Sequence, residues 1–280
     1  MIVNLDGTFI ADDQAGLPVD DGAILFGDTL FETIKVRHNT ILLAEPHLDR
    51  IQMSAALLDF PCDRDAIRTA LQQTAKQLPW PVARMRLTLS RGRCKGLQSP
   101  PKENARTLIT ASAYVEPDDN QIRAGADCVF APNRRVNPLS HLPQMKRGNY
   151  ADCLYAARFA QAKGAREALF CNDEGHVLEG ATSNLFIVKD NILITPEAGE
   201  VVLAGIMRRH ILQIAKTLGL ATEERPISKN DLILADEAFL SNALIDIMPI
   251  ARIESTHIKR GKLAIKLLQK IRESINHQIK

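Results

Sequence analysis

The chain has 280 residues, which is enough for one large domain or two modest ones with buried cores. Its formal net charge is only +2 and its basic and acidic residues are interspersed, which argues against nucleic acid or an anionic membrane as a partner. There is no run long enough for a membrane span, no signal-peptide pattern and no paired-cysteine motif, so we expect a soluble cytoplasmic protein with reduced thiols.

The first part of the chain predicts a small α/β domain. Asp6-Gly7 is a hairpin signal, and in residues 83–90 apolar side chains alternate with Arg84, Arg86 and Thr88 as in a half-buried strand. The polar, turn-rich residues 116–120 indicate a domain boundary. The strands expected here are 1–4, 8–10, 30–36, 41–43, 83–90 and 107–113, and the helices are 47–58 and 65–78.

The second part of the chain again mixes strands and helices. Without a regular βαβ alternation, the whole chain predicts an α+β fold: an N-terminal domain (1–116), a linker (117–122) and a larger C-terminal domain (123–280). The strands expected here are 128–131, 168–171, 185–188, 192–195 and 237–241, with a short run at 244–250, and the helices are 151–164, 205–219 and 262–279.

Lys146 lies where an irregular, proline-containing segment meets the helix expected from Ala151. The positive end of a helix dipole disfavours an ammonium group, so this lysine is a candidate amine nucleophile of the kind that forms a Schiff base with a carbonyl compound or pyridoxal phosphate. The alternative is a solvated surface lysine beside Arg147.

Pyridoxal phosphate at Lys146 would require an anion at its ring nitrogen and donors for its phosphate. Glu179, at a strand end before Gly180, is the candidate anion, and a surface glutamate is the alternative. The phosphate would suit a helix N-terminus, a guanidinium group or polar side chains at the end of a strand. Arg50 could equally be a surface arginine, and Asn242 could equally be a turn residue. The candidates are the backbone of Gly205, Ile206 and Met207, and the side chains of Arg50, Ser241 and Asn242. The seven histidines have no metal-ligand spacing, so no metal site is expected.

Seven motifs, in order, resemble the class IV (fold type IV) pyridoxal-phosphate enzymes, a family of branched-chain aminotransferases, D-amino-acid aminotransferases and 4-amino-4-deoxychorismate lyases. The motifs are FGDTLFETIKV (26–36), HLDRI (47–51), KRGNY (146–150), EALF (167–170), EGATSNLFIV (179–188), GIMRRHIL (205–212) and DEAFLSNALIDIMPI (236–250). The resemblance implies two domains with pyridoxal 5'-phosphate between them, a small-molecule substrate and a homodimer.

The resemblance also implies roles for individual residues. Lys146 would bind the cofactor, Glu179 would hold its ring nitrogen and Phe31 would line the substrate side. Arg50, the backbone of Ile206 and Met207, and Asn242 would form the phosphate cup, with Ser183, Asn184, Gly205 and Ser241 also at the cofactor.

The motifs do not fix the reaction. The Arg-x-His pattern of D-amino-acid aminotransferases is absent from SRGRCKGLQ, and EGATSN differs from the EGSGEN-like text of branched-chain enzymes. Ser90-Arg91-Gly92 and the Ser-Asn-Ala-Leu…Met-Pro run resemble the lyases, with Arg91 and Arg93 as candidate hosts for substrate carboxylates, whereas KRGNY favours the transaminases. We expect a lyase that makes 4-aminobenzoate and pyruvate from 4-amino-4-deoxychorismate. The alternatives are an aminotransferase for D- or branched-chain amino acids, and a member that binds without turnover.

Overall fold

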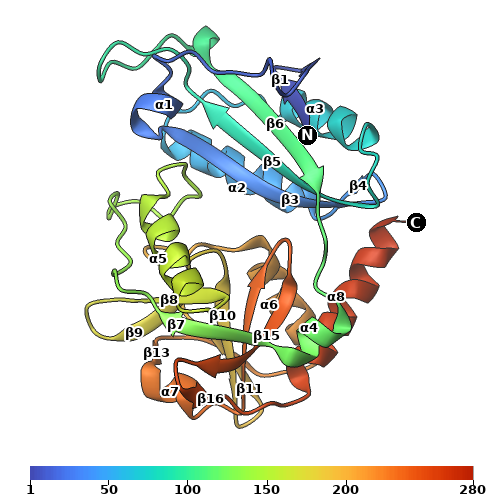
Figure 1. The fold of residues 1–280 in the computed structure, drawn as a ribbon, viewed down its shortest axis with the longest axis vertical. Coiled ribbons are helices and arrows are strands. Elements are labelled where there is room, and N and C mark those ends of the chain that lie inside the picture. The colour runs from blue at the N-terminus through green and yellow to red at the C-terminus, as the bar shows by residue number, and fades with distance from the viewer. Residues whose placement is uncertain (280) are drawn as a thin grey trace. The chain divides into compact units, whose positions relative to one another are not determined.

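The computed structural model describes residues 1–279, which form two compact units (Figure 1). The first unit includes Met1–Glu116 and Met145–Tyr150, and the second includes Pro117–Gln144 and Ala151–His277. Residues 117–122, expected to be a linker, therefore lie within the second unit. None of the described helices is long and apolar enough to span a membrane.

The first unit is built on a six-stranded sheet with the order β2-β1-β6-β5-β3-β4. Helices α2 and α3 pack against this sheet (Figure 1). The strands are β1 (Ile2–Leu5), β2 (Thr8–Ile10), β3 (Thr29–Arg37), β4 (Thr40–Ile41), β5 (Val82–Ser90) and β6 (Arg106–Ala113). The helices are α1 (Gly22–Phe26), α2 (Ala44–Leu57), α3 (Arg64–Lys76) and a 3-10 turn at Lys102–Asn104.

The two faces of this sheet differ as the alternation in residues 83–90 predicted. Met85, Leu87 and Leu89 are buried, whereas Arg84 is exposed and Arg86 is half-buried. Strands β3 and β5 pair in antiparallel register, and residues directly opposite each other share a face. Phe31 pairs with Thr88 and Thr33 with Arg86, so these four residues lie on one face; Glu32 and Ile34 lie on the face that α2 covers.

Two local features of the first unit differ from the sequence prediction. Helix α2 begins at Ala44 rather than His47, because Pro46 lies in its first turn, where a missing N–H group breaks no helical bond. Helix α1 was not expected; Asp21 caps it by accepting from the Ala23 N–H, and Gly27 ends it with φ 64°.

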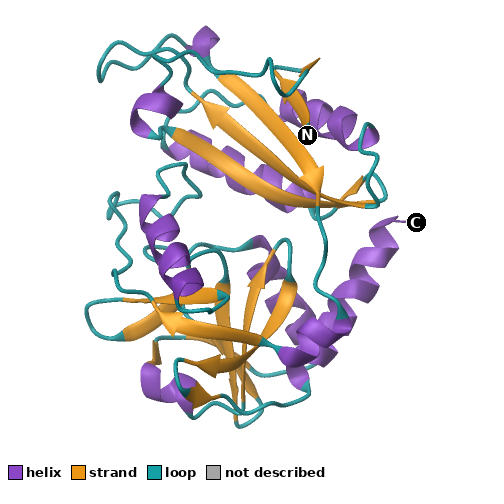
Figure 2. Ribbon diagram, viewed as in Figure 1, coloured by secondary structure: helices purple, strands orange, loops and turns teal. Residues whose placement is uncertain are grey.

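The second unit contains a ten-stranded sheet that partly closes on itself. Strands β10, β14, β15, β7, β8 and β9 pair in this order, and an additional pairing of β9 with β10 joins the ends. The closing pair is Asn184 opposite Glu179. Figure 2 shows the strands gathered together with helices against them. The strands are β7 (Ala126–Phe130), β8 (Glu167–Cys171), β9 (His176–Gly180), β10 (Asn184–Lys189), β11 (Ile192–Thr195), β12 (Thr222–Glu224), β13 (Ile227–Ser228), β14 (Glu237–Asn242), β15 (Asp246–Ile253) and β16 (Thr256–His257).

The helices of the second unit agree with the prediction for the three long ones. They are α4 (Asp119–Ala124), α5 (Ala151–Ala162), α6 (Ile206–Thr217), α7 (Lys229–Ile233) and α8 (Leu263–Ile279). Helix α4 replaces the turn expected at residues 116–120. Its signal was a capping box, in which Asp118 accepts from the Gln121 N–H and the Gln121 side chain accepts from the Asp118 N–H.

Candidate functional site

The segment of residues 145–150, which contains Lys146, lies beside the first residues of β3, where Arg147 forms an isolated antiparallel bridge with Leu30. The Phe31 N–H donates to the Lys146 carbonyl at 3.0 Å, and the Gly148 N–H donates to the Thr29 carbonyl at 2.8 Å. Position 148 requires glycine because a Cβ atom there would lie 1.8 Å from the Thr29 hydroxyl oxygen. The sheet of the first unit therefore fixes the backbone of Lys146.

The Lys146 side chain lies over two aromatic rings. Its Nζ is 4.6 Å from the centroid of the Phe31 ring and 5.9 Å from that of Tyr150. The two rings meet edge to face, with centroids 5.5 Å apart. Helix α5 begins only at Ala151, so Lys146 lies outside its first turn and the expected effect of the helix dipole is not supported. The aromatic rings, rather than a helix end, form the surroundings of this amine.

Arg86 brings a second cation to the same Phe31 ring. Its Cζ lies 3.7 Å from the ring centroid, and its Nε donates to the Thr88 hydroxyl at 3.2 Å. Burial lowers the pKa of this guanidinium, and no carboxylate of residues 1–279 pairs with it. A half-buried guanidinium without a carboxylate is suited to an anion from outside the chain. In the sequence, the alternation of residues 83–90 placed Arg86 only among the polar positions of a half-buried strand.

A buried carboxylate holds Arg50 on the other face of β3. Glu32 accepts from Arg50 Nε at 2.7 Å and Nη2 at 2.5 Å, and it lies 2.6 Å from His47 Nδ1. Burial alone would raise the pKa of Glu32, but the Arg50 charge and the hydrogen bonds from His47 and Arg50 lower it to about 2. Burial lowers the pKa of His47, and the positive charges of Arg50 and Lys146 act in the same direction, against the opposing effect of Glu32. Arg50 is thus paired with a permanent carboxylate.

Glu32→Gln is expected to destabilise the protein by about 3 kcal/mol at neutral pH, since each unit between an ordinary pKa of 4.5 and one of about 2 corresponds to about 1.4 kcal/mol. Because the folded pKa is the lower one, this stabilisation is present above pH 4.5 and is lost as the pH falls towards 2. Urea unfolding at several pH values should therefore show the two proteins converging in acid. Glu45→Gln, which changes an exposed carboxylate on α2, is the control and should stay near wild type. A gap between wild type and Glu32→Gln that does not change with pH would contradict the assignment.

In the second unit, Glu179 is buried at the end of β9 among fixed donors. Its Oε2 accepts from the Leu203 N–H at 3.0 Å and from Asn184 Nδ2 at 3.4 Å, and its Oε1 lies 3.2 Å from Arg135 Nη2. Asn184 also donates to the Leu203 carbonyl at 2.9 Å. Because Glu179 is only 4% exposed and paired with a cation, it is a positioned carboxylate rather than the surface residue considered as an alternative.

Arg135 is a functional candidate that the sequence analysis did not identify. It bonds Asp152 at 2.5 Å and the Cys153 sulfur at 3.0 Å, and it contacts the Gln144 side-chain oxygen once that amide is oriented to accept. Burial would lower the pKa of Arg135, but the charge of Glu179 and its other partners raise it. No local sequence feature shows this role, because the pairing of Arg135 with Glu179 depends on the fold.

A second buried carboxylate, Glu167, supports the loop that follows Glu179. Glu167 accepts from the Thr182 hydroxyl at 2.8 Å and the Ser183 hydroxyl at 2.9 Å. A Cβ at Gly180 would lie 2.8 Å from the Glu167 side chain, so this glycine permits the close contact. Ser183, expected at the cofactor, therefore has its hydroxyl engaged in holding the loop.

Backbone donors are available at the start of α6. Gly205 precedes the helix without a side-chain acceptor, and the first helical bond runs from the Arg209 N–H to the Gly205 carbonyl. Within the described chain, the N–H groups of Ile206 and Met207 have no acceptor. Glycine is required at 205 because a Cβ would lie 1.9 Å from Asn184 Oδ1. Such a helix start is suited to an oxyanion.

Strand β14, against which α6 packs, ends with Ser241 and Asn242, the two polar side chains that were candidates for binding the phosphate. Asn242 Oδ1 accepts from the N–H groups of Leu244 and Ile245, both at 2.9 Å, and its Nδ2 donates to the Thr182 carbonyl at 3.2 Å. Asn242 therefore closes a turn. The Ser241 hydroxyl is fully buried and, in the part of the chain described, has no hydrogen-bond partner. Ser241, rather than Asn242, is the side chain left to donate to an oxyanion.

The two arginines expected to meet substrate carboxylates have other partners. Arg91 pairs with Asp28 at 2.9 Å and stacks 3.9 Å from the Phe60 ring centroid. It also donates to the carbonyls of Leu58 and Asp59, which follow α2. Arg93 is 65% exposed and pairs with Asp20 at 3.1 Å. These contacts connect loops of the first unit and do not support a substrate role for Arg91.

Residues 29–253 match the family model described as amino-transferase class IV. The chain belongs to the class IV aminotransferase family. The expected family is therefore confirmed, and Lys146, Glu179 and the start of α6 all fall within the matched region.

Relatives of this class IV chain cover nearly its full length. A putative branched-chain-amino-acid aminotransferase of Methanocaldococcus jannaschii is 30% identical over 98% of the chain and 96% of its own length. The 4-amino-4-deoxychorismate lyase structure from Pseudomonas aeruginosa has a TM-score of 0.88 and 28% identity, covering 97% of this chain and 98% of its own. A T.th. branched-chain amino acid aminotransferase with pyridoxamine 5'-phosphate has a TM-score of 0.89 and 25% identity, covering 99% and 94%. The expected fold type IV architecture is thereby confirmed.

Proposed function

We propose that the protein is an aminotransferase that moves an amino group from a small amino acid to a 2-oxo acid. The observation that carries this proposal is that Lys146 and Arg86 contact the same Phe31 ring. A reactive amine and a cation without a carboxylate partner, held on one ring, are suited to a substrate that carries its amine next to a carboxylate. The homodimer and the cytoplasmic location expected from the sequence belong to the same proposal.

The cofactor of this family is pyridoxal 5'-phosphate, and the residues of the chain are suited to it. The buried Ser241 hydroxyl and the N–H groups of Ile206 and Met207 would bind its phosphate. Glu179, kept charged by Arg135, would hold its ring nitrogen in the protonated form.

When bound, the cofactor withdraws electrons from the amine-bearing carbon of the substrate. The chain supplies the proton transfers and the positions of the groups. Lys146 would remove the proton from that carbon and, in the second half of the exchange, deliver a proton to the corresponding carbon of the 2-oxo acid. Arg86 binds the substrate carboxylate and thereby orients the carbon towards Lys146, and Phe31 and Tyr150 exclude water from the amine.

The second candidate is the 4-amino-4-deoxychorismate lyase, which the sequence analysis preferred. The 28% identity to the P. aeruginosa lyase structure and the run from Ser241 to Pro249 favour it. The loop after Ser90 no longer supports it strongly, because Arg91 there has structural partners. We prefer amino transfer because the M. jannaschii relative, a putative branched-chain-amino-acid aminotransferase, is 30% identical to this chain.

A product assay separates the two reactions. The purified holoenzyme is mixed with L-leucine or D-alanine and 2-oxoglutarate, and in parallel with 4-amino-4-deoxychorismate and no oxo acid. We expect glutamate to form in the first mixture and no 4-aminobenzoate in the second. Arg86→Gln should raise KM for the amino acid about 10- to 100-fold, as expected for a lost charge-assisted hydrogen bond, whereas Arg84→Gln on the same strand should not. Equimolar pyruvate and 4-aminobenzoate in the second mixture would establish the lyase instead.

A further inference from the structure

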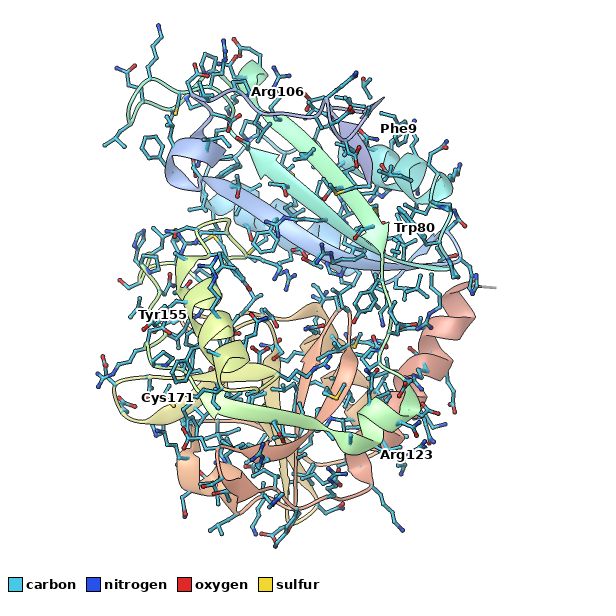
Figure 3. The ribbon with its side chains drawn as sticks, viewed as in Figure 1. Phe9, Trp80, Arg106, Arg123, Tyr155 and Cys171 are labelled. Atoms are coloured by element: carbon cyan, nitrogen blue, oxygen red, sulfur yellow. The ribbon has the colours of Figure 1, made fainter. Side chains whose placement is uncertain are left out.

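The second unit contains a cavity of about 280 Å³ that is lined by residues from the end of α4, strands β14 and β15, and the start of α8. Its walls are mainly apolar and include Ile122, Ile250 and Ile265. Its charged lining includes Arg123, whose position at the end of α4 is labelled in Figure 3, and Arg260. The residues proposed to bind the cofactor and substrate do not line this cavity.

The two arginines at this cavity bond neutral oxygens. Arg260 donates to the carbonyls of Arg123 and Ala124, and Arg123 donates to Asn120 Oδ1 at 2.7 Å. Neither guanidinium pairs with a carboxylate within residues 1–279. Two cations that bond only neutral oxygens leave a positive potential at the cavity.

The one carboxylate in the lining is hydrogen-bonded to the backbone at the start of α8. Glu237 accepts from the N–H groups of Leu263 and Ala264 at 2.7 and 2.9 Å, and so caps the start of α8. It is only 7% exposed. Lys259, also in the lining, makes a long, exposed pair of 3.6 Å with Asp236. The cavity therefore combines an apolar interior with an excess of positive charge.

We propose that this cavity binds a small monocarboxylate with an apolar tail and no ammonium group. The tail would displace water from the isoleucine walls, and the carboxylate would lie at Arg123 and Arg260. A free amino acid is disfavoured, because its ammonium group would meet two guanidinium groups and a carboxylate that is already hydrogen-bonded. The site thus selects for 2-oxo or simple carboxylic acids over the corresponding amino acids, which makes it a means of sensing an acid separately from its amino form.

Hexanoate is the probe, and isoleucine methyl NMR of the full holoenzyme is the readout. Hexanoate is expected to shift the methyl signals of Ile122, Ile250 and Ile265, assigned by Ile→Val replacements, with a Kd of about 1 mM or below. Arg123→Gln should weaken binding about 10-fold, and Arg123→Lys should restore much of it. Arg123 is exposed and, among the described residues, its side chain bonds Asn120 alone, so this variant should keep the fold.

Matched ligands and variants make the result decisive. Hexylammonium, 1-hexanol and L-leucine should leave these methyl signals unmoved at the same concentration, and Arg158→Gln, an exposed arginine on α5, should bind hexanoate like wild type. Lys146→Ala should also keep the shifts, which separates this cavity from the amino-acid site. Unmoved methyl signals at 10 mM hexanoate, equal shifts with 1-hexanol, or undiminished binding by Arg123→Gln would each overturn the proposal.

Discussion

Lys146→Ala is expected to lower kcat for amino transfer by at least about 10³-fold. The variant loses both the amine that holds the cofactor and the group that moves the proton at the substrate carbon. The fold should survive, because the backbone bonds between residues 145–150 and β3 do not involve this side chain. The measurement is glutamate formation under saturating substrate, together with the visible absorption of the bound cofactor.

The control for this variant is Lys163→Ala, which removes an exposed lysine that follows α5. It should retain both activity and the absorption band. Urea unfolding should give Lys146→Ala and Lys163→Ala similar midpoints. Activity within 10-fold of wild type in Lys146→Ala, or an unchanged absorption band, would remove Lys146 from the proposed role.

The elements that the sequence predicted well are those with strong local signals. The alternation in residues 83–90 gave the two faces of β5, and Gly205 marked the start of α6. The Asp6-Gly7 turn has the positive φ angles, 52° and 85°, that its residue types favour. Boundaries moved by a few residues where a cap decided them, as at Asp63, which caps α3 with its side chain.

The contacts that define the candidate site could not be predicted in the same way, because they join residues far apart in the sequence. Nothing local indicates that Lys146 lies beside β3, or that Arg86 contacts the same ring as Lys146. Glu32 and Glu167 stood within recognised motifs, but their partners are set by strand pairing and helix packing. Residue identities therefore indicated the chemistry, and the fold decided which side chains remain available for it.

Glu179→Gln is expected to lower kcat on the order of 10²-fold, with a smaller change in KM, because a neutral amide cannot keep the cofactor's ring nitrogen protonated. The substitution also leaves Arg135 with one carboxylate fewer in a buried site, where it retains Asp152. We therefore expect a loss of stability of about 2 kcal/mol, below the range for breaking an isolated buried pair. Activity and urea unfolding measure the two effects separately.

A double-mutant cycle with Arg135→Gln distinguishes a positioned pair from two independent buried charges. If Arg135 keeps Glu179 charged and oriented, the two substitutions should be coupled by at least about 1 kcal/mol in both stability and kcat. Arg135→Gln alone should then also reduce kcat, although the cofactor's contacts in the proposal do not include it. Arg166→Gln, an exposed arginine before β8, is the matched control and should show no coupling to Glu179→Gln. If the two effects add to within about 0.3 kcal/mol, Arg135 stabilises the fold and does not act through Glu179. The charge of Glu179 would then be stabilised by the Leu203 N–H and the Asn184 side chain instead.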